Sequence, residues 1–370
     1  MSKTAPLLPA GFYDLLPDDA ALESGCVSRL LGAFSAFGYE QVSPPLMEFE
    51  TSLFEGRGEE LARQTFRVLD PVSKNMMGVR ADMTLQVARI AASRLASVPR
   101  PLRLCYAGQI LQTVPEALRN ERQLTQAGME LIGSDALQAD IEVITIAAWS
   151  LEALGITDIT IDINLPGLVA ELCPEAKNDP ALQARIKDAV TRKDAEMIAK
   201  LPVKASSTLA ALVGAAGPAA KALTVLDSLN IPQVSALREL TQRVARHCPS
   251  LALTIDPIEY RGFDYHNGIS FSIFARGLRY ELGRGGRYTV EGEPATGFTI
   301  YVTPLLGILP RPAKPKKLLV GKQAAMAKVK ELQSQGWVTL YALTDDLSAE
   351  AKKLGVRFYL SADGKQISEI

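Results

Sequence analysis

Hydrophobic positions in the first 165 residues follow two patterns. Apolar residues recur every three or four positions at 18–37, 82–98 and 137–154, a spacing that gives a helix one apolar face. Apolar runs or strict alternation, which are typical of strands, occupy 102–111 and 157–163. We therefore expect helices and strands to be mixed in this part of the chain.

Residues 165–247 have a different pattern. They are rich in alanine and interrupted by Pro180, Pro202, Pro218 and Pro232, which predicts about five short helices and almost no strand. Strand patterns return afterwards, at 251–259, 268–275, 278–283 and 296–302. Because strands lie on both sides of the helical block, we expect one antiparallel sheet domain that carries an inserted helical bundle.

The C-terminal residues predict a separate small domain. The segment 311–317 is proline-rich, and proline fixes φ and disfavours helix, which indicates a linker. Beyond it, strand and helix patterns alternate, at 318–320, 324–335, 338–343, 347–354 and 356–360. We expect an α+β core over 1–310, and a small α/β domain with a partly parallel three-stranded sheet over 318–370.

The composition excludes several classes of protein. With 47% hydrophobic and 22% charged residues, the chain is ordinary for a globular protein and unlike a disordered one. No apolar run approaches the roughly 20 residues that cross a bilayer, and the N-terminus lacks the apolar segment of a signal peptide. Four scattered cysteines and two histidines argue against a disulfide framework and a zinc site. We expect a reduced cytoplasmic protein with no metal and no membrane contact.

Charge is unevenly distributed along the chain. Residues 311–370 carry 11 Lys and Arg against 6 Asp and Glu, although the net charge of the whole chain is −1. A basic tail is compatible with nucleic-acid binding, and also with lysines that are merely solvated. Because aromatic and basic residues are not interleaved there, solvated lysines are the favoured interpretation, and we expect no nucleic-acid partner.

Two segments combine glycine with arginine, GRGE at 56–59 and GRGGRY at 283–288. Neither matches a dinucleotide-binding or Walker pattern. A tight turn between strands explains each of them. The alternative is an anion site, because glycine exposes backbone N–H groups and arginine offers a planar fork to a phosphate or carboxylate.

Two further segments bring polar side chains together. Asp82 and Thr84 stand at a predicted helix start, and Gln126 and Glu130 lie on one face of a strand with Gly128 between them. Carboxylate and amide groups around such a gap suit an ammonium group. The alternative is a helix cap for Asp82 and an exposed strand face for Glu130.

The segment 259–271 places Arg261, Asp264, Tyr265 and His266 just before a predicted strand. Arginine can bind a carboxylate, and aromatic rings can line a pocket. A histidine beside a tyrosine is more often structural than catalytic, so His266 alone indicates little.

In order and spacing, these segments together resemble the class II aminoacyl-tRNA synthetases, specifically the histidyl-tRNA synthetases, over about residues 7–310. The resemblance is carried by PAGFYDLLP (9–17), FGYEQVSPPLME (37–48), VRADMT (79–84), the strands at 101–133, YRGFDYHNGISF (260–271), GRGGRY (283–288) and TGFTIYVTPLL (296–306). It implies a class II antiparallel core with a helical insertion. It also implies a homodimer, with 37–48 at the interface.

In that family the corresponding positions hold the amino acid histidine. The residues that the resemblance implies for histidine binding are Asp82, Thr84, Gln126, Glu130, Arg261, Tyr265 and His266. The first three would meet the α-amino group, Glu130 the imidazole and Arg261 the α-carboxylate, while the last two would line the ring. Asp82 stands where the family has a glutamate, and His266 where it has a second tyrosine.

Two positions depart from the synthetase pattern. Gln112 replaces the motif 2 arginine that grips the α-phosphate of ATP, and Pro304 replaces the motif 3 arginine that contacts adenine and the γ-phosphate. Neither side chain substitutes for a guanidinium on a phosphate. Residues 318–370 are also shorter than an anticodon-binding domain. We therefore expect no aminoacylation and no catalytic residues.

A synthetase-like core that keeps the amino-acid site but loses the ATP site resembles the regulatory subunits of ATP phosphoribosyltransferase, the first enzyme of histidine biosynthesis. This resemblance implies a non-catalytic subunit without cofactor. It implies that a homodimer joins a short-form catalytic subunit in a hetero-octamer and senses histidine. Two alternatives remain: a divergent histidyl-tRNA synthetase or amino-acid-activating paralogue, and an RNA-binding regulator built on the same core.

Overall fold

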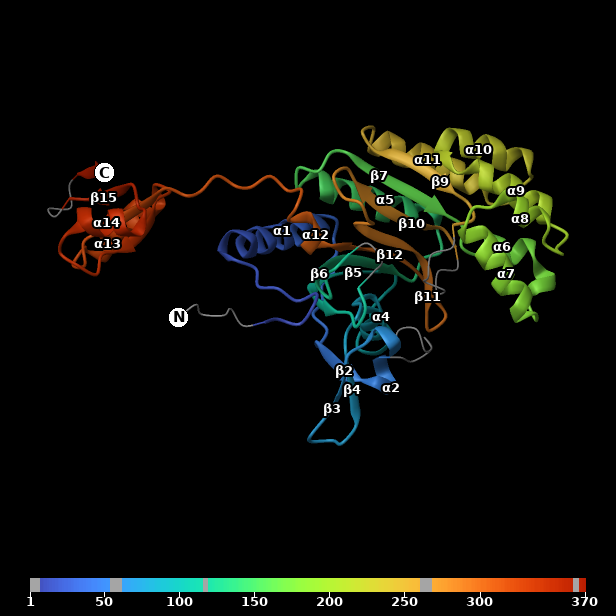
Figure 1. Ribbon diagram of the computed structural model, residues 1–370, viewed down its shortest axis with the longest axis horizontal. Coiled ribbons are helices and arrows are strands. Elements are labelled where there is room, and N and C mark those ends of the chain that lie inside the picture. Colours follow the sequence, from blue (N-terminus) through green and yellow to red (C-terminus); the bar gives the residue numbers. More distant parts are fainter. Residues whose placement is uncertain (1–6, 54–61, 116–118, 260–267, 362–365) are drawn as a thin grey trace. The chain divides into compact units, whose positions relative to one another are not determined.

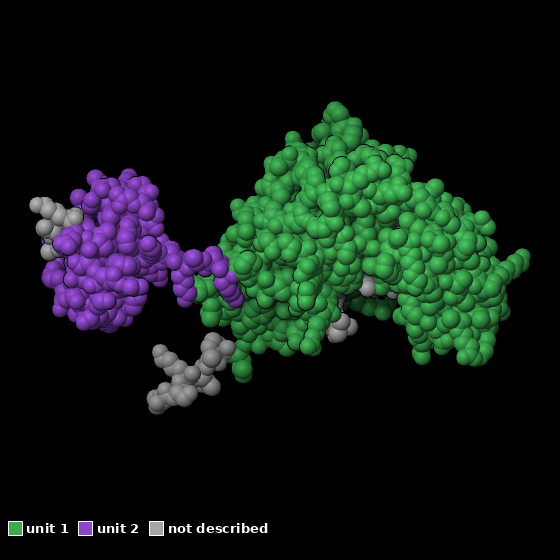
Figure 2. Space-filling model, turned by 90° about the horizontal axis from the view of Figure 1, so that it is seen from above, with its two compact units in different colours: residues 1–310 green, residues 311–370 purple. Residues whose placement is uncertain are grey.

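The computed structural model describes residues 7–53, 62–115, 119–259, 268–361 and 366–370. The chain forms two compact units, residues 1–310 and 311–370 (Figure 2). The division falls at the start of the predicted proline-rich linker. Each unit has its own sheet and its own hydrophobic core.

A nine-stranded sheet forms the centre of the larger unit, in the order β1-β5-β6-β12-β11-β10-β7-β9-β8 (Figure 1). Its strands are β1 (Glu40–Gln41), β5 (Leu102–Leu111), β6 (Gln123–Ile132), β7 (Ile159–Asn164), β8 (Gly217–Pro218), β9 (Ala252–Asp256), β10 (Ser270–Ala275), β11 (Gly283–Val290) and β12 (Glu293–Tyr301). Among these strands, β1 pairs with β5 and β7 pairs with β9 in parallel, and the other neighbours are antiparallel. The predicted antiparallel core is confirmed, with parallel pairs towards both edges.

Alternation along the strands gives this sheet two different faces. One face is apolar, with residues such as Met129 and Phe298 packed under α1 (Pro17–Ala36) and α5 (Leu137–Glu152). The opposite face is apolar where α4 (Thr84–Ser93) covers it and polar further along, for example at Ser272 and Thr299. The main core therefore lies on one side of the sheet, and the polar residues lie on the other.

The helix predicted at 82–98 is shorter in the structure. Its N-cap is Met83, and α4 ends at Ser93 before a series of turns. Asp82 precedes the cap and accepts a hydrogen bond from the Thr84 backbone N–H (2.8 Å). The expectation that Asp82 is the cap of this helix is therefore wrong, because its carboxylate supports the turn that enters the helix instead.

The predicted helical insertion lies between β7 and β9. It contains α6 (Leu168–Leu172), the 3-10 helix η1 (Pro174–Ala176), α7 (Pro180–Thr191), α8 (Ala195–Ala199), α9 (Ser206–Ala215), α10 (Ala219–Ser228) and α11 (Val234–His247). Pro180 begins α7 rather than interrupting a helix, because the first turn needs no backbone donor at that position. The two-residue strand β8 is the exception to an otherwise helical block.

A smaller sheet, in the order β2-β4-β3, precedes α4. Its strands are β2 (Met47–Phe49), β3 (Arg67–Leu69) and β4 (Met76–Val79), and the short helix α2 (Glu50–Leu53) follows β2. The sequence did not predict this sheet, because strands of three or four residues are too short to show an alternating pattern. β4 leads directly into the turn that contains Asp82.

The strand predicted at 278–283 is misplaced. β11 begins at Gly283 and runs to Val290, so the GRGGRY segment lies inside a central strand and not in a turn. A Cβ on Gly285 would meet the Phe271 ring, and Gly286 has a φ of +148°. These glycines, which suggested a turn, instead permit close approach between neighbouring strands. β12 ends in the short helix α12 (Val302–Leu305).

The unit over residues 311–370 is a four-stranded sheet in the order β14-β13-β15-β16. Its elements are β13 (Lys317–Val320), α13 (Met326–Ser334), β14 (Val338–Tyr341), α14 (Leu347–Leu354), β15 (Phe358–Leu360) and β16 (Ile367–Glu369). The first three strands are parallel, as predicted, whereas β16 is an unpredicted antiparallel addition beside β15. Lys317 belongs to β13, so the linker is one residue shorter than expected.

In the part of the chain that the structure describes, no helix is both long enough and apolar enough to cross a membrane. The same residues contain no group of three or more His, Cys, Asp and Glu side chains placed to hold a metal ion. All four cysteines are buried and free. Burial raises the pKa of Cys26 to about 12, which keeps this thiol protonated.

Candidate functional site

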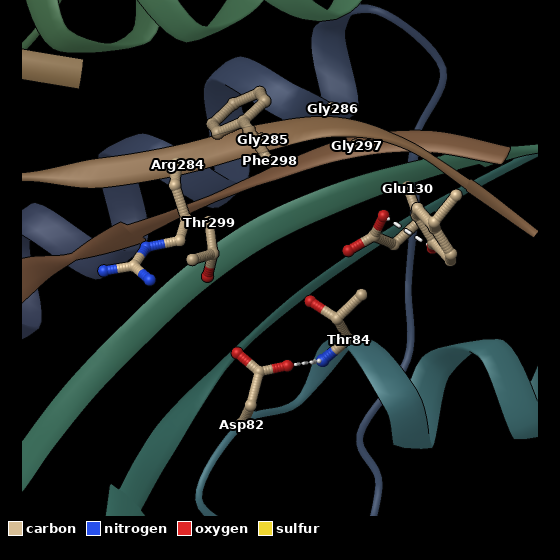
Figure 3. Close-up of a pocket in the computed structure, with 10 residues that line it drawn as sticks. Asp82, Thr84, Glu130, Arg284, Gly285, Gly286, Gly297, Phe298 and Thr299 are labelled. Atoms are coloured by element: carbon tan, nitrogen blue, oxygen red, sulfur yellow. Dashed lines mark hydrogen bonds between the residues drawn. The ribbon is translucent and has the colours of Figure 1, made fainter. Parts of the chain in front are cut away.

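A polar pocket lies on the sheet face opposite α1 and α5, where α4 begins (Figure 3). The empty space between its lining residues is about 320 Å³, a volume that includes solvent at its open mouth. Its side chains come from the turn before α4 and from β6, β11 and β12, and include Asp82, Thr84, Glu130, Arg284, Tyr288 and Thr299. Arg284 and Thr299 project from the sheet toward the side where Asp82 and Thr84 lie, whereas Phe298 projects from the other face (Figure 3).

Glycines form the floor of this pocket. Gly297 on β12 pairs with Gly286 on β11 and with Glu130 on β6. A Cβ on Gly297 would overlap the Glu130 carboxylate, and a Cβ on Gly128 would lie 2.6 Å from the Tyr106 hydroxyl. The missing side chains are therefore what allows Glu130 and Tyr106 to extend across the neighbouring strands.

Glu130 is a deeply buried acid, with 1% of its surface exposed. The Tyr106 hydroxyl donates to its Oε1 (3.0 Å), and the Tyr288 hydroxyl donates to its Oε2 (2.7 Å). Burial raises the pKa of Glu130 to about 8, although both hydrogen bonds favour the ionised form. The alternative of an exposed strand face for Glu130 is therefore wrong. A cation or N–H donor that enters the pocket stabilises the carboxylate that burial disfavours.

The second acid, Asp82, accepts two hydrogen bonds at the entrance to α4, and a third hydrogen bond holds its partner Gln126 in place. Gln126 Nε2 donates to Asp82 Oδ2 (2.6 Å), while Gln126 Oε1 accepts from the Met83 backbone N–H (2.9 Å). The Thr84 backbone N–H donates to Asp82 Oδ1 (2.8 Å). Thr84 Oγ1 lies 3.0 Å from the Tyr106 hydroxyl, so one hydrogen-bonded network connects the two acids of the pocket.

This arrangement suits a small zwitterion that carries a basic ring. The carboxylates of Asp82 and Glu130 can accept hydrogen bonds from an ammonium group and from a ring N–H. Thr84 contributes a neutral partner, and the Arg284 guanidinium matches a carboxylate in charge and shape. Histidine combines these three groups, and the side chains present fit them.

The structure brings together four of the seven residues expected at this site. Asp82, Thr84, Gln126 and Glu130 converge through the hydrogen bonds above. Arg261, Tyr265 and His266, like the GRGE segment, lie outside the described residues. Their roles stay predictions.

Sequence reasoning did not assign four side chains in or beside this pocket to the histidine site: Tyr106, Arg284, Tyr288 and Thr299. Arg284 and Tyr288 were hidden because GRGGRY suggested a turn, whereas in a strand the alternate positions 284, 286 and 288 share a face. Thr299 lies on the same face of β12 as Gly297 by the same rule. The alternation of side chains along β11 and β12 could therefore have revealed these pocket residues, if the strand boundaries had been predicted correctly.

The two positions that depart from the synthetase pattern are both buried. Gln112 directly follows β5, and its backbone N–H bonds the Arg122 carbonyl (2.8 Å). Pro304 lies within α12. Next to this helix, the Arg119 guanidinium lies 4.1 Å from the centre of the buried Tyr301 ring.

Comparison with known proteins agrees with this geometry. The sequence profile of the histidyl-tRNA synthetase family matches residues 11–305. Among solved structures, the chain is similar to an ATP phosphoribosyltransferase regulatory subunit/histidyl-tRNA synthetase from Bacillus halodurans, with a TM-score of 0.80, 21% identity, and coverage of 95% of this chain and 96% of that one. It is also similar to the histidyl-tRNA synthetase of Nostoc, with a TM-score of 0.73, 19% identity, and coverage of 96% and 91%. These likenesses confirm the predicted class II synthetase-like fold.

Curated relatives are much more similar in sequence. An ATP phosphoribosyltransferase regulatory subunit from Rhodospirillum centenum is 46% identical over 96% of this chain and 94% of its own length. One from Paramagnetospirillum magneticum is 46% identical over 98% of both chains. Identity at this level, along nearly the whole length and including the C-terminal unit, shows that the chain belongs to the family of ATP phosphoribosyltransferase regulatory subunits.

Proposed function

We propose that this chain is the non-catalytic regulatory subunit of ATP phosphoribosyltransferase, which activates a short-form catalytic subunit and transmits feedback inhibition by histidine. Membership of the family supports the regulatory role. The observation that carries the histidine part is the network of the buried Glu130 and Gln126 on the polar face of the sheet with the half-buried Asp82 beside them. It offers partners of the correct charge for an α-amino group and an imidazole.

A physical argument connects such a pocket to regulation. A ligand changes a remote active site only if it binds one conformation of the complex better than another. A histidine site without a catalytic use for histidine serves regulation when the two conformations of the complex bind histidine with different affinity. The proposal includes a homodimer within a hetero-octamer, because the segment 37–48 resembles the dimer-forming motif 1, and it places the complex in the cytoplasm without nucleic acid.

An aminoacyl-tRNA synthetase is the function that the same fold would otherwise suggest. Gln112 and Pro304 weigh against it, because each removes a guanidinium from a phosphate that carries charge in the transition state. Losing one such contact costs about 2–4 kcal/mol of transition-state stabilisation, or roughly 10²–10³-fold in rate.

The experiment that separates the two functions combines calorimetry with pyrophosphate exchange on the same purified protein. We expect titration with histidine to show saturable binding, while histidine-dependent exchange of pyrophosphate into ATP stays at background. Exchange at a rate typical of a synthetase would overturn the regulatory assignment. If the protein does not bind histidine, the regulatory assignment would stand without the histidine role of this pocket.

A further inference from the structure

We propose that Arg284 binds the α-carboxylate of the amino acid in this pocket, and that Glu281 holds its guanidinium in position. The inference rests on the proposed histidine site and adds a residue that determines which imidazole compounds the site accepts. Arg284 is then a binding residue, and Glu281 is a positioning residue.

The register of the sheet places Arg284 on the pocket face. Arg284 on β11 is paired with Thr299 on β12, Thr299 with Gly128 on β6, and Gly128 with Tyr106 on β5. These four positions form one row across neighbouring strands, and paired residues point to the same side of a sheet. Arg284 consequently faces the same cavity as Glu130, which is two residues beyond Gly128, and Figure 3 shows it projecting there.

The Arg284 guanidinium has an acidic partner on its own side of the sheet, Glu281. Its Nε forms an ion pair with Glu281 Oε1 (2.5 Å), and the side chains of Arg284 and Glu281 are 17% and 8% exposed. The Ser272 hydroxyl donates to the other oxygen of Glu281 (3.3 Å). A guanidinium fixed in this way loses little conformational freedom when a carboxylate arrives, which favours binding.

The charges of the pocket also point to a carboxylate. Among the described side chains that line it, Arg284 is the permanent cation and faces two acids, Asp82 and Glu130. The Thr299 hydroxyl beside it is buried without a hydrogen bond of ordinary geometry, although it lies close to the Tyr106 hydroxyl. A carboxylate oxygen between Arg284 and Thr299 would accept from both.

A contact with Arg284 is compatible with the expected role of Arg261. A carboxylate has two oxygens and about four acceptor sites, so two arginines can bind it together. Arg284 would therefore be a second cation for the carboxylate, and its ion pair with Glu281 holds it in position.

The test compares histidine with histamine, which has the same ring and amino group but no carboxylate. By calorimetry on the full-length protein, we expect the wild type to bind histidine at least tenfold more tightly than histamine. Arg284→Met should weaken histidine binding at least tenfold and change histamine binding less than threefold, because only the carboxylate contact is lost. Glu281→Gln should give a smaller loss for histidine alone, because it frees the guanidinium without removing it.

Two further variants keep the test decisive. Arg284→Met leaves the Glu281 carboxylate buried without its cation, so the double variant Arg284→Met/Glu281→Gln is the neutral counterpart if the single variant does not fold. The matched control is Arg287→Met on the same strand, because Arg287 pairs with Asp140 (2.8 Å) on the opposite face and should leave the preference for histidine unchanged.

The outcomes separate this inference from the function on which it rests. If the wild type binds no histidine, the histidine-sensing part of the proposed function fails and this inference fails with it. If the wild type binds histidine, but the Arg284 variants retain the same preference for histidine over histamine, the role of Arg284 is overturned while the proposed function stands.

Discussion

Glu130 shows how one buried residue can control the chemistry of the pocket. Its raised pKa, about 8, means that the empty pocket holds this carboxyl mainly protonated at pH 7. An imidazolium or a ring N–H placed against it favours the ionised form. Recognition of a basic ring and ionisation of Glu130 are therefore coupled.

The first prediction concerns this contact. Glu130→Gln should weaken histidine binding at least tenfold, because an amide lacks the charge that matches the ring and offers the ligand a competing donor. Calorimetry at pH 7 measures the effect. Glu293→Gln is the control, because its carboxylate forms a partly exposed ion pair with Arg100 away from the pocket. Equal affinity in both variants would place the histidine site elsewhere.

The second prediction concerns stability. Since the pKa of Glu130 in the folded protein lies above its unfolded value of about 4.3, the folded state holds the proton more tightly. This contribution to stability is complete below about pH 4 and is lost as pH rises toward 8. Thermal denaturation of unliganded protein should therefore show Glu130→Gln gaining stability relative to wild type between pH 5 and pH 8. A difference that does not change with pH would contradict the raised pKa.

At the scale of elements, the pocket exists because β6, β11 and β12 carry glycines where other strands carry side chains. At Gly297, a Cβ would overlap the Glu130 carboxylate and lie 2.5 Å from the Met129 carbonyl oxygen. Its position on a central strand leaves the neighbouring backbone little room to move. The acid must then shift away from its two tyrosine partners.

The third prediction follows from this packing. Gly297→Ala should lower histidine affinity at least tenfold by displacing Glu130, with calorimetry as the measurement and circular dichroism to check that the protein is folded. Gly25→Ala is the matched control. Gly25 lies within α1 with nothing within 4 Å of a Cβ, so alanine there should add about 0.5–1 kcal/mol of stability and leave binding unchanged. Unaltered binding in Gly297→Ala would mean that Glu130 does not contact the ligand.

Long periodic segments were predictable from the sequence, and short or glycine-bearing ones were not. α1, α5, β5 and β6 have ten or more residues and agree with their patterns. The sheet β2-β4-β3 and strand β16 are too short to produce a pattern. The prediction of β11 failed for another reason. Its glycines permit close packing of neighbouring strands, but in the sequence they resembled turn signals. The site was half predicted as a result: the residues on β6 and at the start of α4 were assigned to histidine binding, whereas the GRGGRY segment on β11 was considered only as an alternative anion site.

At the scale of the whole molecule, the described pocket residues all belong to the unit over residues 1–310. This unit contains the nine-stranded sheet and the main hydrophobic core, and the linker begins at Arg311. The C-terminal unit has a sheet and core of its own. Histidine binding should therefore not depend on the C-terminal unit.

The fourth prediction tests this independence. A chain that ends at Pro310 should bind histidine within about threefold of the full-length affinity, because coupling within a factor of three is below the usual range of about 5–150-fold for linked sites. Calorimetry on both chains gives the comparison. A folded shorter chain that does not bind histidine would show that the C-terminal unit completes the site.

Regulation by this chain requires that histidine bound to it changes the activity of another protein. The most direct measurement is the rate of a short-form ATP phosphoribosyltransferase, with and without this chain, across a histidine titration. We expect the chain to raise the rate and histidine to lower it only when the chain is present, with Arg284→Met shifting the inhibition to higher histidine concentrations. A rate that is the same with or without the chain, and with or without histidine, would contradict the account.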